Sequence, residues 1–458
     1  MNRCSVLVLA AGQGTRMRSR LPKVLHPLAG QPLLWHILRA VRPLQPERLV
    51  VITGFQAEAV EQTIAAPDIH WVRQCERKGT GHAVQCALPA LKELRGALLI
   101  LNGDHPLIST EILQQLLDYH HRQGHPLTLL TTRMENPAGY GRVVRDAQGQ
   151  VACIVEEKDA SEAQRAIDEV NTGFYCLSLD RLPHWIGRLD NRNAQNEYYL
   201  TDIVPMALAE GGVAAWCCEE RIALSGVNDR RQLATLERAF RDRTVAAWME
   251  RGVTFVDPES CWVAADAEIG MDTIIEPHVS LGPGTVIGEG CAIGPFCHIQ
   301  ESVIGLECRI LSYSHLDGAE VDAECTIGPY ARLRPGSRLA RKVRVGNFCE
   351  VKKSTIGAGT KVNHLSYIGD AQVGSGVNVG AGTITCNYDG VHKHRTVIGD
   401  HVFVGSDVQF VAPVQVGVGA TIGAGTTVTK DVPADALAIS RAHQTHVMGW
   451  SEKRKPRS

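Results

Sequence analysis

An apolar residue returns at every sixth position over much of the second half of the chain. From Ile398 onward these positions are Ile398, Val404, Phe410, Val416, Ile422 and Val428, and four of the six are followed directly by glycine. An α-helix repeats every 3.6 residues and a half-buried strand every two residues, so neither explains this spacing. A six-residue period with glycine beside the anchor is typical of a β-solenoid, whose chain winds in flat-sided coils.

The same period recurs upstream of this segment, at Leu281, Ile287, Ile293, Ile327, Leu333, Leu339, Val345 and Val351. Three flanks of this length close one triangular coil, with apolar anchors stacked inside and glycine or small residues at the corners. The period shortens to five between Val351 and Ile356 and between Ile368 and Val373. We predict a solenoid from about Val253 to about Ile439.

The period is broken outright between Thr385 and Thr396 by the polar string T-C-N-Y-D-G-V-H-K-H-R-T. A solenoid accommodates an insertion only as a loop that leaves the coil, and such loops commonly lie on the binding face. This segment is therefore the first place to look for chemistry in the second half.

Strand-like apolar runs alternate with amphipathic stretches in the first half of the chain. The clearest predicted strands are Val6–Leu9, Leu49–Ile52, Ala97–Leu101 and Leu127–Thr131. This alternation is typical of βαβ units in a doubly wound, Rossmann-like sheet, whose binding sites lie at the carboxyl ends of the strands.

A helix is predicted between the two halves, because Asp229–Arg251 contains neither glycine nor proline. Its apolar residues Leu233, Leu236, Phe240 and Trp248 suit one helix face. Asn228 or Asp229 can cap its start, and Gly252 can end it. With 458 residues the chain is too long for one ordinary core. We therefore predict a domain at 1–228, a linker helix at 229–252, and the solenoid with its tail at 253–458.

Charge and hydropathy exclude several classes of partner. The formal net charge is −2, and the longest basic cluster is the tail Lys453, Arg454, Lys455 and Arg457. Bulk charge therefore does not indicate binding to nucleic acid or to a membrane surface. No apolar run reaches the length of a membrane span, and Val6–Leu9 is too short for a signal peptide. We expect small-molecule substrates, no nucleic acid and no membrane insertion.

The 14 cysteines are scattered, and no C-x-x-C pair occurs. The adjacent Cys217 and Cys218 cannot bridge each other without strain. A chain with free thiols and no zinc site fits this pattern best, and we expect a cytoplasmic location.

A glycine-rich turn follows the first predicted strand and reads L-A-A-G-Q-G-T-R-M from Leu9 to Met17, with Lys23 shortly after. Such a turn presents backbone N–H groups to phosphate oxygens, and Arg16 and Lys23 add positive charge. A Walker A loop would need G-K-[ST], which is absent, and a dinucleotide fingerprint would need a third glycine where Met17 stands. A plain strand-to-helix turn with two surface cations is the structural alternative.

The string G-x-G-T-R-M with a following P-K resembles the sugar-phosphate nucleotidyltransferases. Gln74 precedes G-T-G-H-A at 79–83, which resembles the uracil-reading segment of uridylyltransferases. Asp104 ends an apolar strand, where that family keeps a Mg²⁺-binding aspartate. Further strings fall in the family's order, namely G-Y-G-R at 139–142, Glu156, N-T-G at 171–173 and G-V-N at 226–228.

This resemblance implies a site for UTP and its sugar nucleotide product. The implied residues are Leu9, Ala10, Ala11, Gly12, Lys23, Gln74, Gly79, Thr80, Gly141, Glu156, Asn171 and Asn228. Arg16 and Lys23 would neutralise the triphosphate, while Asp104 and Asn228 would hold Mg²⁺. Two departures from the family pattern stand beside Asp104, namely Asn102 before it and His105 after it.

A second set of polar residues lies on the predicted solenoid. Cations occur at Arg332, Arg334, Lys352 and Lys353, and His364 stands on a flank near the interrupting loop. A histidine near its reference pKa suits proton abstraction at neutral pH, although a lone histidine is usually structural. We expect the loop residues His392 and His394 to be solvated instead.

The strings A-R-L-R-P-G, V-K-K, H-L-S-Y-I-G-D and G-A-G-T-I-T-C-N-Y-D-G resemble the left-handed β-helix acyltransferases. That resemblance implies the left hand of the coil and a homotrimer in which neighbours complete each acetyl site. It implies that His364 deprotonates the substrate amine and that Glu350 orients His364. The implied sugar-phosphate residues are Arg334, Lys352, Tyr367, Asn378 and Lys393. The implied acetyl-CoA residues are Ala381, Asn387, Tyr388, Ser406, Ala424 and Arg441.

Together the two halves resemble a family of bacterial bifunctional uridylyltransferase–acetyltransferases over nearly the whole chain. The implied reactions acetylate glucosamine 1-phosphate with acetyl-CoA and then transfer UMP from UTP to N-acetylglucosamine 1-phosphate. The products would be pyrophosphate and UDP-N-acetylglucosamine, a precursor of peptidoglycan and lipopolysaccharide, with Mg²⁺ as cofactor.

Three alternatives compete with this function. One is a nucleotidyltransferase that makes ADP- or dTDP-sugars and uses the solenoid only for assembly, and another is a non-enzymatic assembly protein. Gln74 with G-T-G-H-A favours uridine, while His364 and Arg441 argue against an inert solenoid. A third is a covalent acyl-Cys mechanism at Cys386, but direct transfer to the amine needs no enzyme nucleophile.

Overall fold

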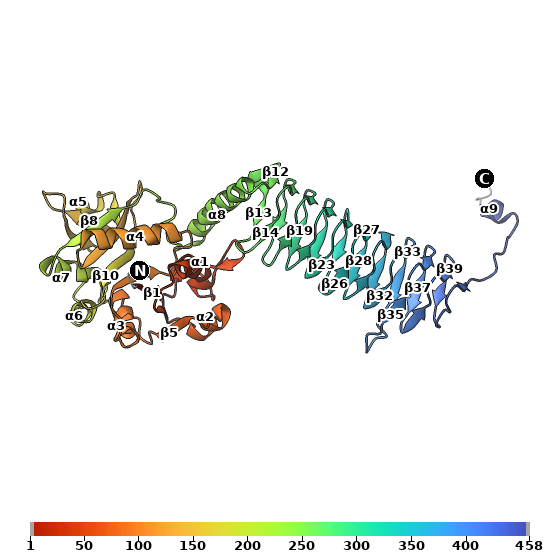
Figure 1. Cartoon of the computed structure of the whole chain (residues 1–458), viewed down its shortest axis with the longest axis horizontal. Helices are drawn as coiled ribbons and strands as arrows, with labels where there is room; N and C mark the ends of the chain where they lie inside the picture. Colours follow the sequence, from red (N-terminus) through yellow and green to blue (C-terminus); the bar gives the residue numbers. More distant parts are fainter. Residues whose placement is uncertain (1–3, 455–458) are drawn as a thin grey trace. The chain divides into compact units, whose positions relative to one another are not determined.

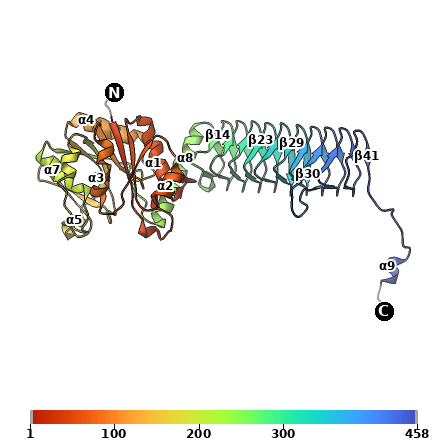
Figure 2. The same ribbon diagram turned by 90° about the horizontal axis from the view of Figure 1, so that it is seen from below.

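The computed structural model describes residues 4–454 and divides at Phe240 and Arg241 into two compact units (Figures 1 and 2). We call Met1–Phe240 the α/β unit and Arg241–Ser458 the coil unit. The basic tail residues Lys455 and Arg457 lie outside the described residues.

The α/β unit is built on a nine-stranded, mostly parallel sheet. Its main path has the order β11-β7-β10-β6-β1-β4-β5, with β10 antiparallel to both β6 and β7. The strands are β1 (Cys4–Ala10), β4 (Leu49–Thr53), β5 (Ile69–Arg73), β6 (Ala97–Asn102), β7 (Leu127–Arg133), β8 (Gly141–Arg145), β9 (Val151–Val155), β10 (Glu169–Ser178) and β11 (Val213–Cys217). A separate two-stranded ribbon pairs β2 (Pro27–Leu28) with β3 (Gln31–Pro32). The four strands predicted from sequence are confirmed as β1, β4, β6 and β7.

Helices cover both faces of this sheet, as the doubly wound prediction requires. They are α1 (Leu33–Val41), α2 (Ala57–Ile64), α3 (Thr80–Leu91), α4 (Thr110–Gln123), α5 (Glu162–Arg165), α6 (Leu182–Ile186) and α7 (Ile203–Ala209), with short 3₁₀ turns η1 (Thr15–Met17), η2 (Lys23–Leu25), η3 (Arg42–Leu44) and η4 (Leu200–Asp202). Successive side chains of a strand point to opposite faces. Accordingly, Val6 and Val8 of β1 join one buried cluster with α1 and α4, whereas Leu7 joins another with α3, α6 and α7.

The predicted helix between the halves is confirmed as α8 (Arg230–Glu250). Asp229 caps its start, because Oδ1 accepts hydrogen bonds from the backbone N–H groups of Arg231 at 2.9 Å and Gln232 at 2.8 Å. Gly252 follows its end with φ of 88°. That left-handed conformation ends a helix at little cost only in glycine.

The coil unit is a parallel β-helix of three sheets with eleven, ten and nine strands, which we call its first, second and third faces. The first face contains β12 (Thr254–Phe255), β15 (Ile274–Ile275), β18 (Ala292–Ile293), β21 (Arg309–Ile310), β24 (Thr326–Ile327), β27 (Arg344–Asn347), β30 (Lys361–His364), β33 (Asn378–Val379), β36 (Phe403–Val404), β39 (Thr421–Ile422) and β41 (Leu437–Ala438). The second contains β13 (Trp262–Val263), β16 (Ser280–Leu281), β19 (His298–Gln300), β22 (His315–Asp317), β25 (Arg332–Leu333), β28 (Glu350–Lys352), β31 (Tyr367–Gly369), β34 (Ile384–Cys386), β37 (Gln409–Val411) and β40 (Thr427–Val428). The third contains β14 (Glu268–Ile269), β17 (Val286–Ile287), β20 (Val303–Ile304), β23 (Ala319–Val321), β26 (Ser337–Leu339), β29 (Thr355–Ile356), β32 (Ala371–Val373), β35 (Thr396–Ile398) and β38 (Val414–Val416). The 3₁₀ turn η5 (Pro258–Ser260) precedes β13, and α9 (Trp450–Lys453) follows the last coil.

The six-residue anchors form the continuous core of this coil. All fourteen anchors named from the sequence belong to one buried cluster, and none of the fourteen is more than 3% exposed. Anchors pair in register with residues one coil further on, as Val345 does with Val362 and Val362 with Val379. The solenoid prediction is therefore confirmed.

The broken segment leaves the coil as a hairpin-like excursion between β34 and β35 (Figure 1). We call Thr385–Thr396 the inserted loop. Tyr388 and Lys393 form an isolated antiparallel bridge across it. The excursion emerges where the second face turns into the third, so it lies beside the second-face strands.

A column of exposed rings follows the corner between the first and second faces. We call His278, Phe296, Tyr313, Tyr330 and Phe348 the aromatic column. Neighbouring rings lie 4.8, 4.9, 4.9 and 5.3 Å apart between centroids. All five residues have φ between 55° and 59°, and the four after His278 are 48–57% exposed. The left-handed conformation also occurs at coil turns without rings, such as those at Glu324 and Lys342, so it belongs to the turn and not to the column.

Candidate active sites

A cavity of about 470 Å³ opens at the carboxyl ends of β1 and β6 in the α/β unit. All twelve residues implied for UTP binding line it, together with Asp104. They come from segments as distant as the first strand and the residues before α8. The fold brings them together because the carboxyl ends of the parallel strands meet at one edge of the sheet.

The glycine-rich turn shapes the floor of this cavity. Gly14 has φ of 68°, and a Cβ atom there would lie 2.6 Å from Cβ of Lys23. Only glycine satisfies both the conformation and this close approach. The turn therefore allows Lys23 to fold back over it toward Asp104.

Four polar residues form a charged network beside the turn. The Lys23 ammonium donates to Asp104 Oδ2 in a short contact and to Asn228 Oδ1 at 3.3 Å. Arg16 Nη2 donates to the same Asn228 oxygen at 2.9 Å. Burial alone would raise the pKa of the Asp104 carboxyl, but the charges of Lys23 and His105 outweigh it and hold that pKa far below its usual range. Asp104 is therefore a carboxylate, and its Oδ2 and the Asn228 oxygen converge on one cation.

Gln74 stands at another part of the cavity and is 5% exposed. Its Nε2 hydrogens point to the carbonyl oxygen of Gly79 at 3.1 Å and to His82 Nδ1 at 3.0 Å. Since both hydrogens are used, Gln74 meets a ligand in the cavity only through Oε1, as an acceptor. The N3–H group of a uracil ring is a donor of the kind this oxygen requires.

Glu156 and Asn171 line the cavity near Tyr175 and Thr201. Thr201 Oγ1 donates to Glu156 Oε1 at 3.4 Å, and burial raises the pKa of the Glu156 carboxyl. Asn171 Nδ2 donates to the Tyr175 hydroxyl at 2.7 Å, and Asn171 Oδ1 accepts from the Gly173 N–H at 3.1 Å. These groups are fixed acceptors and donors of the kind that recognise sugar hydroxyls.

Tyr140, Tyr175 and Thr201 line the cavity without having been singled out as site residues from the sequence. Tyr175 lies four residues after Asn171 on β10, but a bulge between Asn171 and Phe174 shifts the side-chain alternation that would have indicated it. Tyr140 lies inside the G-Y-G-R string, so that motif contained the available signal.

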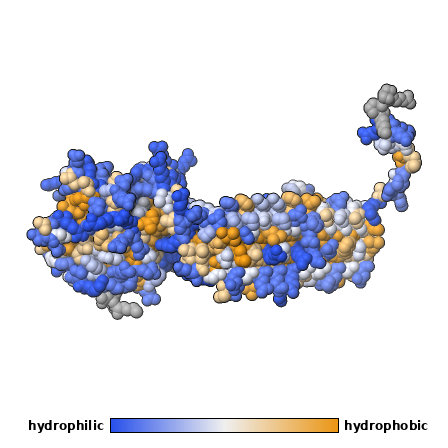
Figure 3. Space-filling view, turned by 90° about the horizontal axis from the view of Figure 1, so that it is seen from above, coloured by the Kyte–Doolittle hydropathy of each residue, from blue (hydrophilic) through white to orange (hydrophobic). Residues whose placement is uncertain are grey.

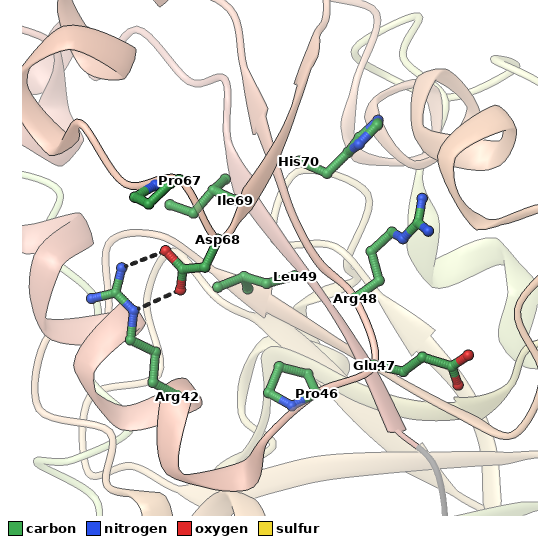
Figure 4. Close-up of a pocket in the computed structure, with 9 residues that line it drawn as sticks. All are labelled: Arg42, Pro46, Glu47, Arg48, Leu49, Pro67, Asp68, Ile69 and His70. Atoms are coloured by element: carbon green, nitrogen blue, oxygen red, sulfur yellow. Dashed lines mark hydrogen bonds and ion pairs between the residues drawn. The ribbon is translucent and has the colours of Figure 1, made fainter.

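A second pocket of the α/β unit lies at the start of β4 and β5, whereas the candidate site lies at the strand ends (Figure 4). Arg42 there donates to Asp68 through two hydrogen bonds of 2.9 and 3.0 Å. That pair neutralises both charges, and the pocket holds none of the predicted site residues.

On the coil unit, three cations gather on the second face and the inserted loop. Arg334 Nη1 donates to Glu350 Oε1 at 2.9 Å. Contact with the Lys393 ammonium, together with burial and the nearby charge of Arg334, lowers the pKa of Lys352. Like charges held this close favour an anionic ligand between them.

His364 lies at the end of β30, where the first face turns toward the second. Its Nδ1 lies 3.0 Å from Asn347 Oδ1. Because an amide oxygen only accepts, Nδ1 carries the hydrogen and Nε2 is the basic nitrogen. Asn347 was not identified as a site residue from the sequence. It stands 17 residues before His364, one coil away at the same corner.

Glu350 does not contact His364 within the described chain, although the resemblance implied that it orients this histidine. Glu350 Oε1 accepts from Arg334, and Glu350 Oε2 lies 3.8 Å from Arg332. The reason is register, since Arg332 pairs directly with Glu350 on neighbouring strands of the second face. Within one chain, Glu350 positions arginine and Asn347 contacts the histidine.

The inserted loop is ordered by Asp389. Its Oδ1 accepts from the N–H groups of Val391 at 2.8 Å and His392 at 2.6 Å, and its Oδ2 lies 2.7 Å from His394 Nε2. These contacts, led by the His392 N–H, lower the pKa of Asp389 to about 2. His392 is exposed as expected, but His394 is half-buried and paired, so the prediction that it is solvated is wrong.

The residues implied for acetyl-CoA binding fall into two groups. Ala381, Ser406 and Ala424 lie in successive coils at one corner, because the Ala381 carbonyl accepts from the Asp407 N–H and the Ser406 carbonyl from the Gly425 N–H. Arg441 lies over the next coil, with Nη2 3.7 Å from the Cβ position of Gly423. Asn387 and Tyr388 lie instead on the inserted loop, where Asn387 donates to Asp370.

The sugar-phosphate residues are also divided between faces. Lys352 and Tyr367 belong to strands of the second face, Arg334 directly follows another strand of that face, and Asn378 belongs to β33 of the first. Patches of hydrophobic surface are visible along the coil unit (Figure 3). Tyr388, His364 and Lys393 are exposed, so the second site lies on an open surface of the single chain.

Residues 4–454 contain neither a clustered metal site nor a membrane-spanning helix. Among these residues, no group of three or more His, Cys, Asp or Glu side chains is arranged to hold a metal ion. The same part of the chain contains no helix long and apolar enough to cross a membrane. All fourteen cysteines fall in this range, and each is a free thiol.

Comparison with known proteins matches both halves. Residues 6–170 match the MobA-like NTP transferase domain, and residues 266–301 and 395–430 match the bacterial transferase hexapeptide family of six repeats. The hexapeptide match is consistent with a left-handed winding of the coil.

Full-length relatives share the whole arrangement. The bifunctional protein GlmU of Trichlorobacter lovleyi is 50% identical over 453 residues, covering 98% of this chain and 98% of the relative. The proteins of the same name from Geotalea daltonii and Stutzerimonas stutzeri are 50% and 49% identical, over 99% and 98% of this chain and 100% and 99% of the relatives. The chain therefore belongs to the family of bifunctional GlmU proteins and is a transferase with two activities.

Proposed function

We propose that the two reactions of this chain take place at separate sites, one in each unit. The chain acetylates glucosamine 1-phosphate with acetyl-CoA and transfers UMP from UTP to N-acetylglucosamine 1-phosphate. It thereby supplies UDP-N-acetylglucosamine for peptidoglycan and lipopolysaccharide precursors. The observation that most supports the first site is the single cavity lined by all of its implied binding residues. We also propose the functional division 1–228, 229–252 and 253–458, with α8 as the linker.

In the α/β unit, the phosphate oxygen of the sugar attacks the α-phosphorus of UTP. A new P–O bond forms, the bond to the bridging oxygen breaks, and pyrophosphate leaves. Since no proton must move, catalysis consists mainly of positioning and charge neutralisation. Arg16 and Lys23, which lie together over Asn228, neutralise the triphosphate. Gln74 accepts from the uracil, and Glu156 and Asn171 hold the sugar.

Asp104 and Asn228 are the residues that would hold Mg²⁺. Their oxygens fit the ion, because they already converge on the Lys23 ammonium and hard oxygen atoms are what Mg²⁺ prefers. Two protein oxygens are enough, since Mg²⁺ usually completes its shell with waters and substrate phosphates. When bound there, the ion would neutralise charge on the phosphates.

In the coil unit, His364 Nε2 takes a proton from the glucosamine amine. The amine nitrogen attacks the acetyl carbon of the thioester, an N–C bond forms, and the C–S bond breaks. The proton on His364 then passes to the leaving thiolate. Asn347 holds the tautomer that keeps Nε2 basic, while Arg334, Lys352 and Lys393 bind the phosphate.

We propose that the chain is a homotrimer through its coil unit. Tyr330 and Phe348 of the aromatic column are 48% and 57% exposed, and an interface would bury this apolar surface. Asn378 lies on a different face from Lys352 and Tyr367. A neighbouring chain packed on the column would bring Asn378 of one chain to Tyr367 of the other, and would bury a site that is open in one chain.

We propose a cytoplasmic location. All fourteen cysteines are free, and nine of them are buried in the two cores. Thiols persist in a reducing compartment, which is also where UTP and acetyl-CoA are available.

One assay separates the two activities. The purified chain is given glucosamine 1-phosphate, acetyl-CoA, UTP and Mg²⁺, and free thiol and pyrophosphate are followed separately. We expect both products, with thiol release first. Absence of thiol release would remove the acetyltransferase assignment, and equal turnover of ATP or dTTP would remove the uridine assignment.

The variant His364→Ala tests the coil site alone. Loss of a general base costs about 10²–10⁴-fold, so thiol release should fall by that factor. Pyrophosphate release from N-acetylglucosamine 1-phosphate should stay within twofold of the unmodified chain. Thiol release at the normal rate would show that another group accepts the proton.

A further inference from the structure

His105 follows the metal-binding Asp104 directly and is 5% exposed. Its Nδ1 lies 2.8 Å from Asp104 Oδ1, while the Lys23 ammonium occupies Asp104 Oδ2. The two carboxylate oxygens therefore have different partners. The imidazole fixes one of them and leaves the other facing the cavity.

The opposite edge of the His105 ring is confined by the segment that leads to Asn228. A Cβ atom on Gly226 would lie 2.8 Å from His105 Cε1 and 3.0 Å from Nε2. The ring also packs on Phe174, with centroids 5.0 Å apart. A backbone hydrogen bond of 2.9 Å from the Val227 N–H to the Asp104 carbonyl joins the same two segments.

His105 Nε2 is buried and has no hydrogen-bond partner within residues 4–454. A buried polar atom without a partner is costly, so a purely structural residue here would be better replaced by an apolar one. Among residues 4–454, the one hydrogen bond of the His105 ring goes to the carboxylate of Asp104.

We propose that His105 is a positioning residue for the metal site. It donates through Nδ1 to Asp104 Oδ1, turns Oδ2 toward the cavity, and sets the spacing between Asp104 and Asn228 by filling the gap to Gly226. This proposal rests on the assignment of Asp104 and Asn228 as the Mg²⁺ ligands. A residue that orients a metal ligand typically contributes 10–100-fold to metal affinity.

The test compares two variants. His105→Leu fills the space with an apolar side chain but loses the donor, and His105→Asn supplies Nδ2 as a donor in place of Nδ1. Binding of Mn²⁺ in the presence of UTP is followed by the electron paramagnetic resonance of the free ion, without turnover. We expect His105→Leu to weaken Mn²⁺ binding by about 10-fold or more and His105→Asn by about threefold or less. The Mg²⁺ concentration for half-maximal pyrophosphate release should shift in parallel, while thiol release by the coil unit should not change.

The matched control is His120→Leu. His120 is also 5% exposed in the α/β unit and also makes one side-chain contact, from Nδ1 to Thr128 Oγ1 at 2.9 Å. Its loss should lower the melting temperature without affecting Mn²⁺ binding. If His120→Leu weakens Mn²⁺ binding as much as His105→Leu does, the effect of His105→Leu comes from general destabilisation of the α/β unit, and the proposal is wrong.

A second pair of variants tests the spacing. Gly226→Ala alone should push the ring away and weaken Mn²⁺ binding. Gly226→Ala combined with His105→Asn should restore most of the loss, because asparagine lacks the two ring atoms that the new methyl group meets. Normal Mn²⁺ binding by both His105→Leu and Gly226→Ala would overturn the proposal. If Asp104→Ala also binds Mn²⁺ normally, the metal site itself has been misassigned.

Discussion

The two candidate sites differ in how much of each a single chain builds. In the α/β unit, residues from nine separate segments line one cavity, and several of them are hydrogen-bonded to one another. In the coil unit, the corresponding residues spread over two faces, a corner and an inserted loop. A doubly wound sheet concentrates its strand ends at one edge, whereas a solenoid distributes equivalent positions along its length. A site on a solenoid therefore depends on a loop or on a neighbouring chain to close it.

The sharpest test of this contrast removes the centre of the enclosed site. Asp104→Ala removes the carboxylate that holds Lys23 and would hold Mg²⁺. We expect pyrophosphate release to fall about 10³-fold, since charge stabilisation of this kind contributes several kcal/mol. Thiol release from glucosamine 1-phosphate and acetyl-CoA should be unchanged, because that site lies in the other unit. A parallel loss of both activities would contradict the separation of the sites.

The second test disrupts the open site by changing a residue of the aromatic column, which lies outside that site. Tyr330→Asp places a charge in the middle of the aromatic column. If the column is a subunit interface, the cost of burying that charge is roughly 2–5 kcal/mol per contact. Sedimentation velocity should then show monomers, and thiol release should fall about 100-fold while pyrophosphate release stays within twofold.

The control for Tyr330→Asp is Val303→Asp on the third face. Val303 is 50% exposed, close to the 48% of Tyr330, but it lies outside the column. We expect this variant to remain a trimer. Dissociation by Val303→Asp and not by Tyr330→Asp would move the interface to the third face.

The third test concerns the cations of the open site. Lys352→Ala removes one of three positive charges that the fold holds together. We expect the KM for glucosamine 1-phosphate to rise about 10-fold, with little change in the KM for acetyl-CoA, because one charged hydrogen bond to phosphate is lost. The control is Arg338→Ala, which removes an exposed third-face arginine that pairs with Glu320 at 3.2 Å. If Arg338→Ala raises this KM equally, the effect of Lys352 reflects the overall positive charge of the coil unit and not a specific phosphate site.

The smallest expected effect comes from comparing Glu156, which lines the enclosed site, with its neighbour Glu157, which does not. Burial raises the pKa of Glu156, whereas the hydrogen bond from Gly139 and the contact with Arg142 outweigh burial and lower the pKa of Glu157. At pH 7, Glu156→Gln should therefore stabilise the α/β unit and Glu157→Gln should destabilise it, by urea denaturation. The Glu156 difference should vanish as the pH falls below the usual glutamate pKa of about 4.3, whereas the Glu157 difference should start to shrink there and vanish only below the lowered pKa of the folded chain. A stabilising effect that persists at pH 3 would assign it to packing.

The coil could be predicted from the sequence almost completely, because its period sets which residues lie inside. Val404 and Phe410 are fully buried, and so are the upstream anchors Leu333 and Val351. The strand order of the α/β unit was harder to predict from the sequence. The strand β10 enters antiparallel between β6 and β7, and no local pattern near Glu169 indicates that position or direction. Pairing with distant strands decides such an order.

The residues of the enclosed site could be predicted from the order of the motifs, but the contacts between residues in both sites could not. Lys23 meets Asp104 across 81 residues, and His105 is confined by Gly226, a contact that the G-V-N string does not indicate. Glu350 was assigned to His364, yet the register places it beside Arg332 and Arg334. Asn347 could have been found by counting back one coil from His364. Partner choice depends on register, which the motifs do not encode.

The regular stacking of the coil also constrains how its length can change in evolution. Equivalent positions recur 17 residues apart in some coils and 18 in others. An insertion or deletion of one whole coil returns every later side chain to its own face, whereas a shift of one residue exchanges inward and outward positions. The length between α8 and His364 can therefore vary only in discrete steps, each about 4.8 Å along the coil axis. Lineages with longer or shorter coils can preserve the acetyl site unchanged while its distance from α8 is altered.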